Sequence, residues 1–342
     1  MRMKEAYLYE KLGGKKVKCN LCSHRCVIPE GKAGICQVRE NRGGILYSLV
    51  YGKAAANNVD PIEKKPFFHF LPGSYSFSIA TVGCNFHCRN CQNFDISQIV
   101  RDNSRITGED FSPDEAVRHA VEYDCKSISY TYTEPAIFLE YSYETACIAR
   151  RKGIRNNFVT NGFMTEEALD FFHPNLDAAN VDLKSFRETF YKEMCGGRLK
   201  PVLSSIKKMK DLGIWIEVTT LIIPTMNDST EELREIAEFI RDVGDDVPWH
   251  VSRFHPTYRV DNIPSTPIEV LRKAREIGME AGLRYVYIGN VPGDDGENTY
   301  CYKCGKLLIK RSGFQVFENL ITDSKCSGCG TVIDGVFEVA DG

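Results

Sequence analysis

The cysteines constrain the fold and chemistry of this chain more than any other residue type. Fourteen are present in 342 residues, and most of them fall into clusters with short internal spacings. The clusters are Cys19, Cys22, Cys26 and Cys36 (C-x2-C-x3-C-x9-C), Cys84, Cys88 and Cys91 (C-x3-C-x2-C), and Cys301, Cys304, Cys326 and Cys329 (C-x2-C-x21-C-x2-C). Four thiolates complete a tetrahedral metal shell, whereas three leave a coordination position open. The spacings therefore predict metal sites of more than one kind along the chain.

Charge and hydropathy argue against a nucleic-acid-binding, membrane-spanning or secreted protein. Lys plus Arg (43) nearly balance Asp plus Glu (46), so no net field attracts nucleic acid or an acidic membrane surface. The longest apolar runs, such as 221–223, are far shorter than the roughly 18 residues that a membrane span requires. The charged N-terminus is followed by no apolar stretch, so we expect no secretory signal. We therefore expect a cytoplasmic protein whose thiols stay reduced and ligate metals rather than form disulfides.

Between the second and third clusters the chain alternates strand-like and helix-like segments. Short segments rich in Val, Ile, Thr and aromatic residues predict strands at Ser76–Val82, Ser127–Tyr132, Arg155–Thr160, Ala178–Leu183, Trp215–Leu221, Trp249–Arg253 and Tyr285–Ile288. Helices are predicted to begin after Ser112, Thr165 and Ser229, because each of these can cap a helix with acidic residues in its first turn. Six or seven βα units predict a parallel sheet and favour an open or closed barrel over a doubly wound sheet. We place this α/β barrel at residues 76–294.

The two ends of the chain lack this alternation and are predicted to be small metal-binding appendages. Residues 295–342 contain two Cys-x2-Cys-Gly knuckles, separated by a segment, 306–319, that predicts a β-hairpin. This pattern is typical of zinc ribbons, with a rubredoxin-like iron site as the alternative. For the less regular cysteines of residues 1–75, zinc, an auxiliary iron–sulfur cluster and free thiols stay open in that order of preference. The other cysteines, Cys125, Cys147 and Cys195, are expected to be small buried apolar residues.

The central cluster determines the chemistry. Cys84, Cys88 and Cys91 lie in one loop that follows the first predicted barrel strand and Gly83. Three thiolates this close in sequence can hold one face of a [4Fe–4S] cubane, whose fourth iron then binds a substrate or cofactor directly. The alternative is a zinc site completed by His87 or by a distant residue. The position of the loop after a first strand favours the cubane.

This loop resembles the signature of the radical S-adenosylmethionine (SAM) superfamily, whose fold is a partial (β/α)6 barrel of the TIM type. The resemblance implies that the amino and carboxylate groups of SAM chelate the open iron. It further implies that the reduced [4Fe–4S] cluster cleaves SAM to methionine and a 5′-deoxyadenosyl radical, which abstracts hydrogen from a substrate. Asn90 departs from the family pattern, because the residue before the third cysteine is usually aromatic and packs near the adenine.

Polar residues at the carboxyl ends of the predicted strands fit such a site. SAM carries an ammonium, a carboxylate and a ribose, and barrel enzymes build their sites at these strand ends. By resemblance, Glu134 and its neighbour Thr133 would hold the methionyl ammonium of SAM. Thr160 and Asn161, which end the next strand, would contact the ribose.

The fourth predicted strand ends in a charged pair. Asp182 and Lys184 are two residues apart and share a face, so both can point into the barrel. Lys184 is the candidate for the SAM carboxylate, and Asp182 for the ribose or ammonium. The alternative is a plain ion pair at a solvated strand end. His250 and Asn290 are further candidates on the SAM side or the substrate side.

A wider set of motifs resembles a narrower family. In chain order they are residues 19–26, 60–66, 84–93, 132–135, 250–256 and the two C-terminal cysteine pairs. Together they resemble the AmmeMemoRadiSam system radical SAM enzymes, which are similar to pyruvate formate-lyase activating enzymes. The resemblance implies an anaerobic oxidoreductase with a low-potential electron donor such as ferredoxin or flavodoxin, acting on a protein or small molecule.

Two other functions stay open. The first is activation of a glycyl-radical enzyme, which the similarity to activating enzymes implies. The second, of a different class, is a non-enzymatic zinc-ribbon scaffold that docks partners. The scaffold would leave the charged and polar strand ends without a role.

Overall fold

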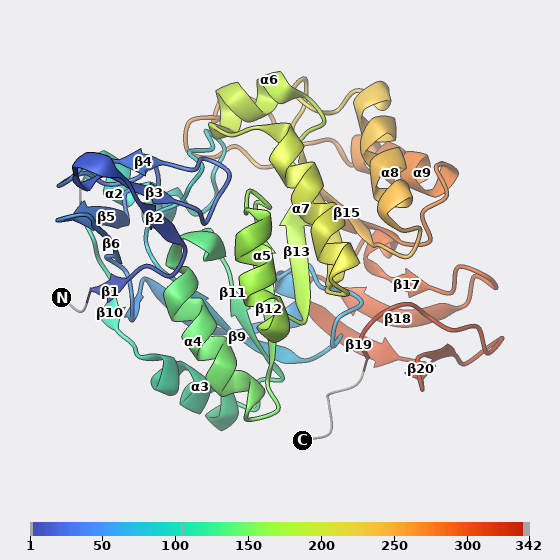
Figure 1. Cartoon of the computed structure of the whole chain (residues 1–342). Helices are drawn as coiled ribbons and strands as arrows, with labels where there is room; N and C mark the ends of the chain where they lie inside the picture. Colours follow the sequence, from blue (N-terminus) through green and yellow to red (C-terminus); the bar gives the residue numbers. More distant parts are fainter. Residues whose placement is uncertain (1–2, 104, 338–342) are drawn as a thin grey trace.

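The central feature of the fold is one eight-stranded sheet that curves into an open barrel (Figure 1). The computed structural model describes residues 3–103 and 105–337. Across the sheet the strands are β16 (Val286–Gly289), β15 (Trp249–Arg253), β14 (Trp215–Ile222), β13 (Ala178–Asp182), β12 (Arg155–Thr160), β11 (Ser127–Tyr130), β9 (Tyr75–Ala80) and β8 (Ala56–Pro61). All neighbours are parallel except β8 and β9. Within the described residues no ladder joins β8 to β16, so the predicted partial barrel is confirmed.

Each barrel strand predicted from the sequence is present. Two of them, β12 and β15, have the predicted bounds, and the others differ by one or two residues at an end. β11 stops at Tyr130 because Tyr132 has a φ of +62°, which cannot continue an extended strand. β16 adds a parallel strand beyond the six that the resemblance implied. The strands of a parallel sheet are buried because other elements cover both of its faces.

The helices lie outside the sheet and follow its strands (Figure 1). Their bounds are α1 (Phe94–Ser97), α2 (Ile99–Asn103), α3 (Pro113–Glu122), α4 (Leu139–Arg150), α5 (Glu166–Phe172), α6 (Glu188–Phe190), α7 (Leu199–Asp211), α8 (Thr230–Val243) and α9 (Ile268–Glu280). The three predicted caps are confirmed. Ser112 forms a capping box with Glu115 at α3, and the hydroxyls of Thr165 and Ser229 accept backbone N–H groups at the starts of α5 and α8.

The segment before residue 76 differs from a free-standing appendage in one respect. Its strand β8 pairs antiparallel with β9 along the edge of the central sheet, from Ala56 opposite Ala80 to Pro61 opposite Tyr75. The strand was missed because βα periodicity does not report an antiparallel edge strand. The loop that follows it, residues 62–66, consequently leaves the sheet at the amino ends of the strands and lines the cavity from that side.

The rest of the N-terminal part forms two small antiparallel sheets, β1-β6-β5 and β2-β3-β4. The strands are β1 (Lys4–Glu5), β2 (Tyr9–Lys11), β3 (Val17–Cys19), β4 (Val27–Ile28), β5 (Arg39–Arg42) and β6 (Ile45–Ser48), and β7 (Lys53–Ala54) pairs separately with β10 (Glu109–Asp110). A bidentate ion pair fixes this part to the barrel, because Arg39 contacts the Glu140 carboxylate at 2.7 and 2.8 Å with both side chains buried.

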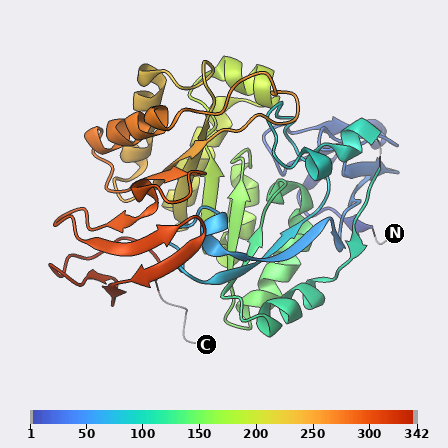
Figure 2. The ribbon, with the colours of Figure 1, turned by 180° about the vertical axis from the view of Figure 1, so that it is seen from behind.

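The C-terminal part is a three-stranded sheet with a metal-ligand cluster. Its strands are β17 (Thr299–Tyr300), β18 (Leu307–Ser312) and β19 (Gln315–Asn319), followed by the pair β20 (Ile321–Thr322) and β21 (Lys325–Cys326). β18 and β19 form the predicted hairpin. Figures 1 and 2 place this part and the N-terminal sheets on opposite sides of the barrel. No helix in the described part of the chain is both long and apolar enough to cross a membrane.

Candidate active site

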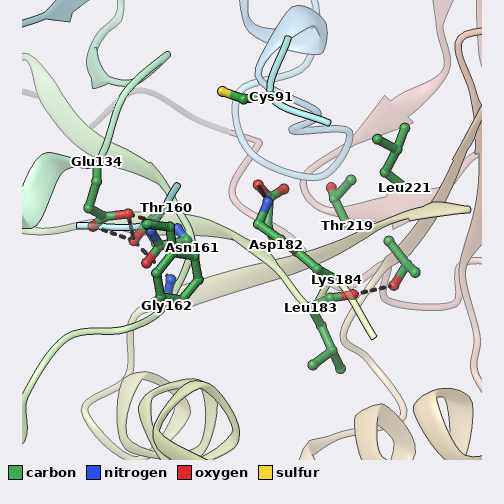
Figure 3. A network of polar contacts seen from close by, with 12 residues as sticks. Cys91, Glu134, Thr160, Asn161, Gly162, Asp182, Leu183, Lys184, Thr219 and Leu221 are labelled. Carbon is green, nitrogen blue, oxygen red and sulfur yellow. Dashed lines mark hydrogen bonds and ion pairs between the residues drawn. The ribbon is translucent and has the colours of Figure 1, made fainter. Parts of the chain in front are cut away.

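The carboxyl ends of the barrel strands surround a cavity of about 390 Å³, a size suited to a small molecule. Of the residues predicted from the sequence, its wall includes Cys84, Cys88, Cys91, Thr133, Glu134, Thr160, Asn161, Asp182, Lys184 and Asn290. Figure 3 shows the polar strand-end residues with Cys91 above them. Parallel strands bring these positions together because all their carboxyl ends meet at one rim of the barrel.

The three central thiols are arranged less compactly than the C-terminal cysteines. Burial raises the pKa of Cys84 and Cys91, whereas a contact with Cys195 lowers the pKa of Cys88. Within the described residues, only the C-terminal cysteines bring three or more potential ligand atoms within 4.8 Å of one another. Zinc holds its sulfurs about 3.8 Å apart, because its tetrahedral Zn–S bonds are about 2.3 Å long. The central thiols lack this compact arrangement, which favours a polynuclear cluster over a single zinc ion.

Backbone contacts position this loop. The N–H groups of His87 and Arg89 donate to the carbonyls of Cys195 and Met194, each at 2.9 Å. The acceptors belong to a π-helical turn that follows α6. Gly83 has a φ of +95°, and a Cβ there would lie 2.6 Å from a side-chain carbon of Val38. Only glycine therefore allows the chain to enter the loop along this path.

Glu134 is a buried carboxylate held by three donors. Its Oε1 accepts from the N–H of Ala136 at 3.1 Å and from the hydroxyl of Thr160 at 2.8 Å. Its Oε2 accepts from the N–H of Asn161 at 2.9 Å. Burial raises the pKa of Glu134 to about 7, although the donors act in the opposite direction. A cation bound beside Glu134 would keep it ionised.

Asp182 and Lys184 form the ion pair expected from their spacing, at 2.7 Å. Their side chains are 36% and 21% exposed and line the cavity, so the pair is neither fully buried nor freely solvated. Burial lowers the pKa of Lys184, but Asp182 and the Cys88 thiol raise it well above its ordinary value overall. Lys184 is therefore a fixed positive charge facing the cavity.

Part of the cavity wall was missed by the sequence reasoning. Lys65 is almost fully buried, lies 2.6 Å from a carboxylate oxygen of Asp60, and packs over the ring of Tyr132. Desolvation lowers the pKa of Lys65 to about 8. Ser252 and Phe314, the latter from the turn between β18 and β19, complete the wall. The charged string at residues 60–66 was the available signal, but its place in the cavity wall depends on the edge strand β8.

His250 requires a correction, because the structure does not bring it to the cavity. It is 2% exposed, and its Nε2 lies 2.7 Å from a carboxylate oxygen of Glu217. Its ring packs against Tyr287 and Phe68, with centroids 5.3 and 4.9 Å away. The neighbouring strand β14 supplies the Glu217 partner, a contact that the sequence of β15 alone does not contain. His250 is a hydrogen-bonded core residue.

The remaining cysteine clusters lie in two separate places. Cys301, Cys304, Cys326 and Cys329 have all four sulfurs within 4.8 Å of one another. Two sulfur pairs, 301 with 329 and 304 with 326, are each 3.7 Å apart. The N-terminal cysteines Cys19, Cys22, Cys26 and Cys36 line another small cavity outside the barrel mouth.

Residues 78–240 match the family described as the radical SAM superfamily. This stretch contains the three-thiol loop, Glu134, Thr160, Asn161 and the charged pair. The chain belongs to the radical SAM superfamily.

The chain is also similar to individual proteins. A pyruvate formate-lyase-activating enzyme of Clostridium pasteurianum is 22% identical over 166 residues, which is 47% of this chain and 67% of that protein. An uncharacterized protein of Methanocaldococcus jannaschii is 48% identical over 335 residues, covering 97% of this chain and 99% of its own. The crystal structure of Streptococcus suis SuiB bound to S-adenosylmethionine has a similar fold, with a TM-score of 0.50 and 13% identity over 64% of this chain and 52% of that one.

Membership of the radical SAM superfamily implies an enzyme that uses a [4Fe–4S] cluster and SAM, and the cavity residues fit both. Among the described residues, no other metal-ligating side chain forms a compact group with the three thiols, which fits a cluster with an open corner. Asn90, the departure from the family pattern, is 9% exposed, and its Oδ1 has no hydrogen-bond partner among the described residues. Asn90 lines the cavity, although this oxygen atom is itself buried.

Proposed function

We propose that this radical SAM enzyme is an oxidoreductase that cleaves SAM and abstracts a hydrogen atom from a protein or small-molecule substrate. The observation that carries the proposal is the convergence, in one cavity, of the three loop thiols, the buried carboxylate of Glu134 and the Asp182–Lys184 pair. When bound, the cluster supplies the electron for reductive SAM cleavage and leaves a hydrogen-abstracting radical beside the substrate. Cys84, Cys88 and Cys91 would hold this cluster.

The ammonium and the carboxylate of SAM each have a complementary partner at the strand ends. Glu134, whose carboxylate Thr160 and Asn161 hold in place, would bind the methionyl ammonium. Lys184 would bind the methionyl carboxylate, and Asp182 would orient Lys184 and accept from the ribose. These contacts fix SAM in one orientation because opposite charges lie on opposite parts of the wall.

The substrate would occupy the part of the cavity lined by Lys65, Ser252, Asn290 and Phe314. Activation of a glycyl-radical enzyme is the second candidate, and the similarity to pyruvate formate-lyase-activating enzymes supports it. A low-potential donor of the ferredoxin or flavodoxin class would supply the electron. We place this reaction in the cytoplasm, where cysteines stay reduced.

We also propose that the C-terminal cysteines hold a structural zinc ion. Sulfur separations of 3.7 Å match the spacing of about 3.8 Å that tetrahedral zinc imposes. The hydroxyl of Thr331 lowers the pKa of Cys329 to about 6, which favours the thiolate form that metals bind. The hairpin between the two cysteine pairs carries Phe314, so this zinc would stabilise one wall of the cavity.

The test is anaerobic reconstitution with iron and sulfide, followed by dithionite and SAM. Chromatography should detect methionine and 5′-deoxyadenosine in the wild-type reaction. Cys88→Ala should abolish product formation, whereas Cys147→Ala, which removes a thiol far from the loop in α4, should retain it. Intact SAM in the presence of the reduced, fully loaded wild-type protein would overturn the proposed function.

A further inference from the structure

The N-terminal cysteines form a site of their own. Cys19, Cys22, Cys26 and Cys36 line one cavity, which Leu21, His24, Ile28, Arg39 and Ile137 complete. This cavity lies between the small N-terminal sheets and the start of α4, on the side of the barrel away from the C-terminal hairpin (Figures 1 and 2). We propose that these four cysteines bind a second [4Fe–4S] cluster, fully ligated by protein.

The spacing of the sulfurs distinguishes a cluster from zinc within this one chain. The C-terminal cysteines are compact, with every sulfur within 4.8 Å of the others. In the described residues no three N-terminal sulfurs meet that limit, and neither do the three thiols at the SAM site. Cysteine sulfurs on different corners of a cubane lie about 6 Å apart, against about 3.8 Å around zinc. Among the described residues, the N-terminal set, like the three thiols at the SAM site, therefore lacks the compact arrangement of the C-terminal cysteines, and zinc, the first expectation from the sequence, fits it less well.

A buried cationic donor at this cavity lacks an acceptor. Arg39 is 2% exposed and gives its terminal nitrogens to Glu140, but its Nε has no hydrogen-bond partner among the described residues. A buried N–H group without an acceptor costs about 1–3 kcal/mol unless a bound group supplies that acceptor. An anionic cluster in the cavity would accept this hydrogen bond through a sulfur atom. Cys19 and Cys36 are close enough to Arg39 to interact with its charge.

Backbone N–H groups follow two of these cysteines at the same short offset. His24 and Val38 follow Cys22 and Cys36 by two residues, an offset at which a backbone N–H can face the cysteine sulfur. The SAM-site loop uses the same offset, because the N–H of Phe86 lies 3.4 Å from the sulfur of Cys84. Such N–H contacts to sulfur stabilise the negative charge of iron–sulfur clusters.

The second site contacts the loop of the first. The Nε2 of His24 donates to the carbonyl oxygen of Asn85 at 2.9 Å. A Cβ on Gly83 would lie 3.0 Å from the backbone oxygen of Cys36. The two metal-binding loops are therefore packed directly against each other. An N-terminal cluster would hold the SAM-site loop in place and would lie beside the SAM-site cluster.

The experiment counts iron, sulfide and zinc in the full chain after anaerobic reconstitution. Wild-type protein should hold about eight iron atoms, and the triple variant Cys84→Ala, Cys88→Ala, Cys91→Ala should keep about four. In that triple variant, SAM should leave the electron paramagnetic resonance spectrum of the reduced cluster unchanged, because no iron is open. Cys22→Ala should remove about four iron atoms from the wild type. The control Cys147→Ala should remove none.

The triple variant alone decides the matter, even if Cys22→Ala fails to fold. A triple variant that carries zinc in place of iron, or whose N-terminal thiols all react with a thiol reagent, would overturn the proposal. Neither result would contradict the proposed SAM chemistry, because the wild-type product assay measures that chemistry separately. Iron without sulfide in the triple variant would also contradict a cubane, because it would indicate a mononuclear site.

Discussion

At the scale of single residues, the cavity depends on charges that are held in place before any ligand arrives. Lys184 keeps its positive charge because Asp182 lies 2.7 Å away. Burial raises the pKa of Glu134, and its three hydrogen-bond donors orient both carboxylate oxygens. Prior orientation of this kind reduces the entropy that ligand binding would otherwise lose.

Lys184→Met should weaken SAM binding by about 10- to 100-fold, because a charge-assisted hydrogen bond contributes about 1.5–3 kcal/mol. The iron content should stay unchanged, since Lys184 is not a ligand. Equilibrium binding of SAM to the reconstituted protein measures this effect. The matched control is Lys192→Met, which removes a lysine whose side chain is 63% exposed. Equal affinities for wild type and Lys184→Met would contradict the role.

Glu134→Gln should also weaken SAM binding, because the amide keeps the shape of the side chain but loses the charge that attracts an ammonium. The expected loss is about tenfold or more. A SAM analogue without the amino group should bind wild type and Glu134→Gln with similar affinity. A loss of affinity that is the same for SAM and this analogue would indicate a packing defect instead.

At the scale of elements, the turn between β9 and the cysteine loop is the most constrained connection. Gly83→Ala should lower the iron bound at the SAM site, because the new Cβ would clash with Val38 and the backbone of Cys36. We expect a loss of about 1–3 kcal/mol in the free energy of unfolding. Iron analysis and urea unfolding measure the two effects.

Gly153→Ala is the matched control for this prediction. Gly153 also has a positive φ, of +71°, but a Cβ there would meet nothing within 4 Å. It therefore reports backbone strain without the clash. If Gly153→Ala lowered the iron content as much as Gly83→Ala, the close contact with the N-terminal part would not be the cause.

At the scale of the whole molecule, a buried histidine links the barrel to the C-terminal part. The Nδ1 of His69 lies 2.6 Å from the carbonyl oxygen of Asp334, and its Nε2 lies 2.5 Å from the hydroxyl of Tyr287. Desolvation lowers the pKa of His69 to about 4. Chain segments more than 200 residues apart in the sequence therefore meet at a group that is stable only in its neutral form.

This histidine predicts a loss of stability in acid. Between pH 6.5 and about pH 4 the unfolded chain protonates this residue while the folded chain does not, so stability falls as the pH falls. The slope from this one group is at most about 1.4 kcal/mol per pH unit. His69→Gln should make urea unfolding less dependent on pH in this window. Identical slopes for wild type and His69→Gln would refute the assignment.

The sequence by itself determined the barrel and many of the polar residues that line its cavity. Strand periodicity, helix caps and the three-thiol spacing are local properties, and local chemistry is enough to place Cys84, Glu134 and Lys184 at strand ends that must meet. Tertiary structure alone decided the rest. The antiparallel edge strand β8 brings Lys65 to the cavity, and Glu217 on a neighbouring strand withdraws His250 into the core. The arrangement of the sulfurs, which is compact at the C-terminal cysteines and less compact at the other two sets, depends on how distant loops pack, and residue spacing carries no record of that packing.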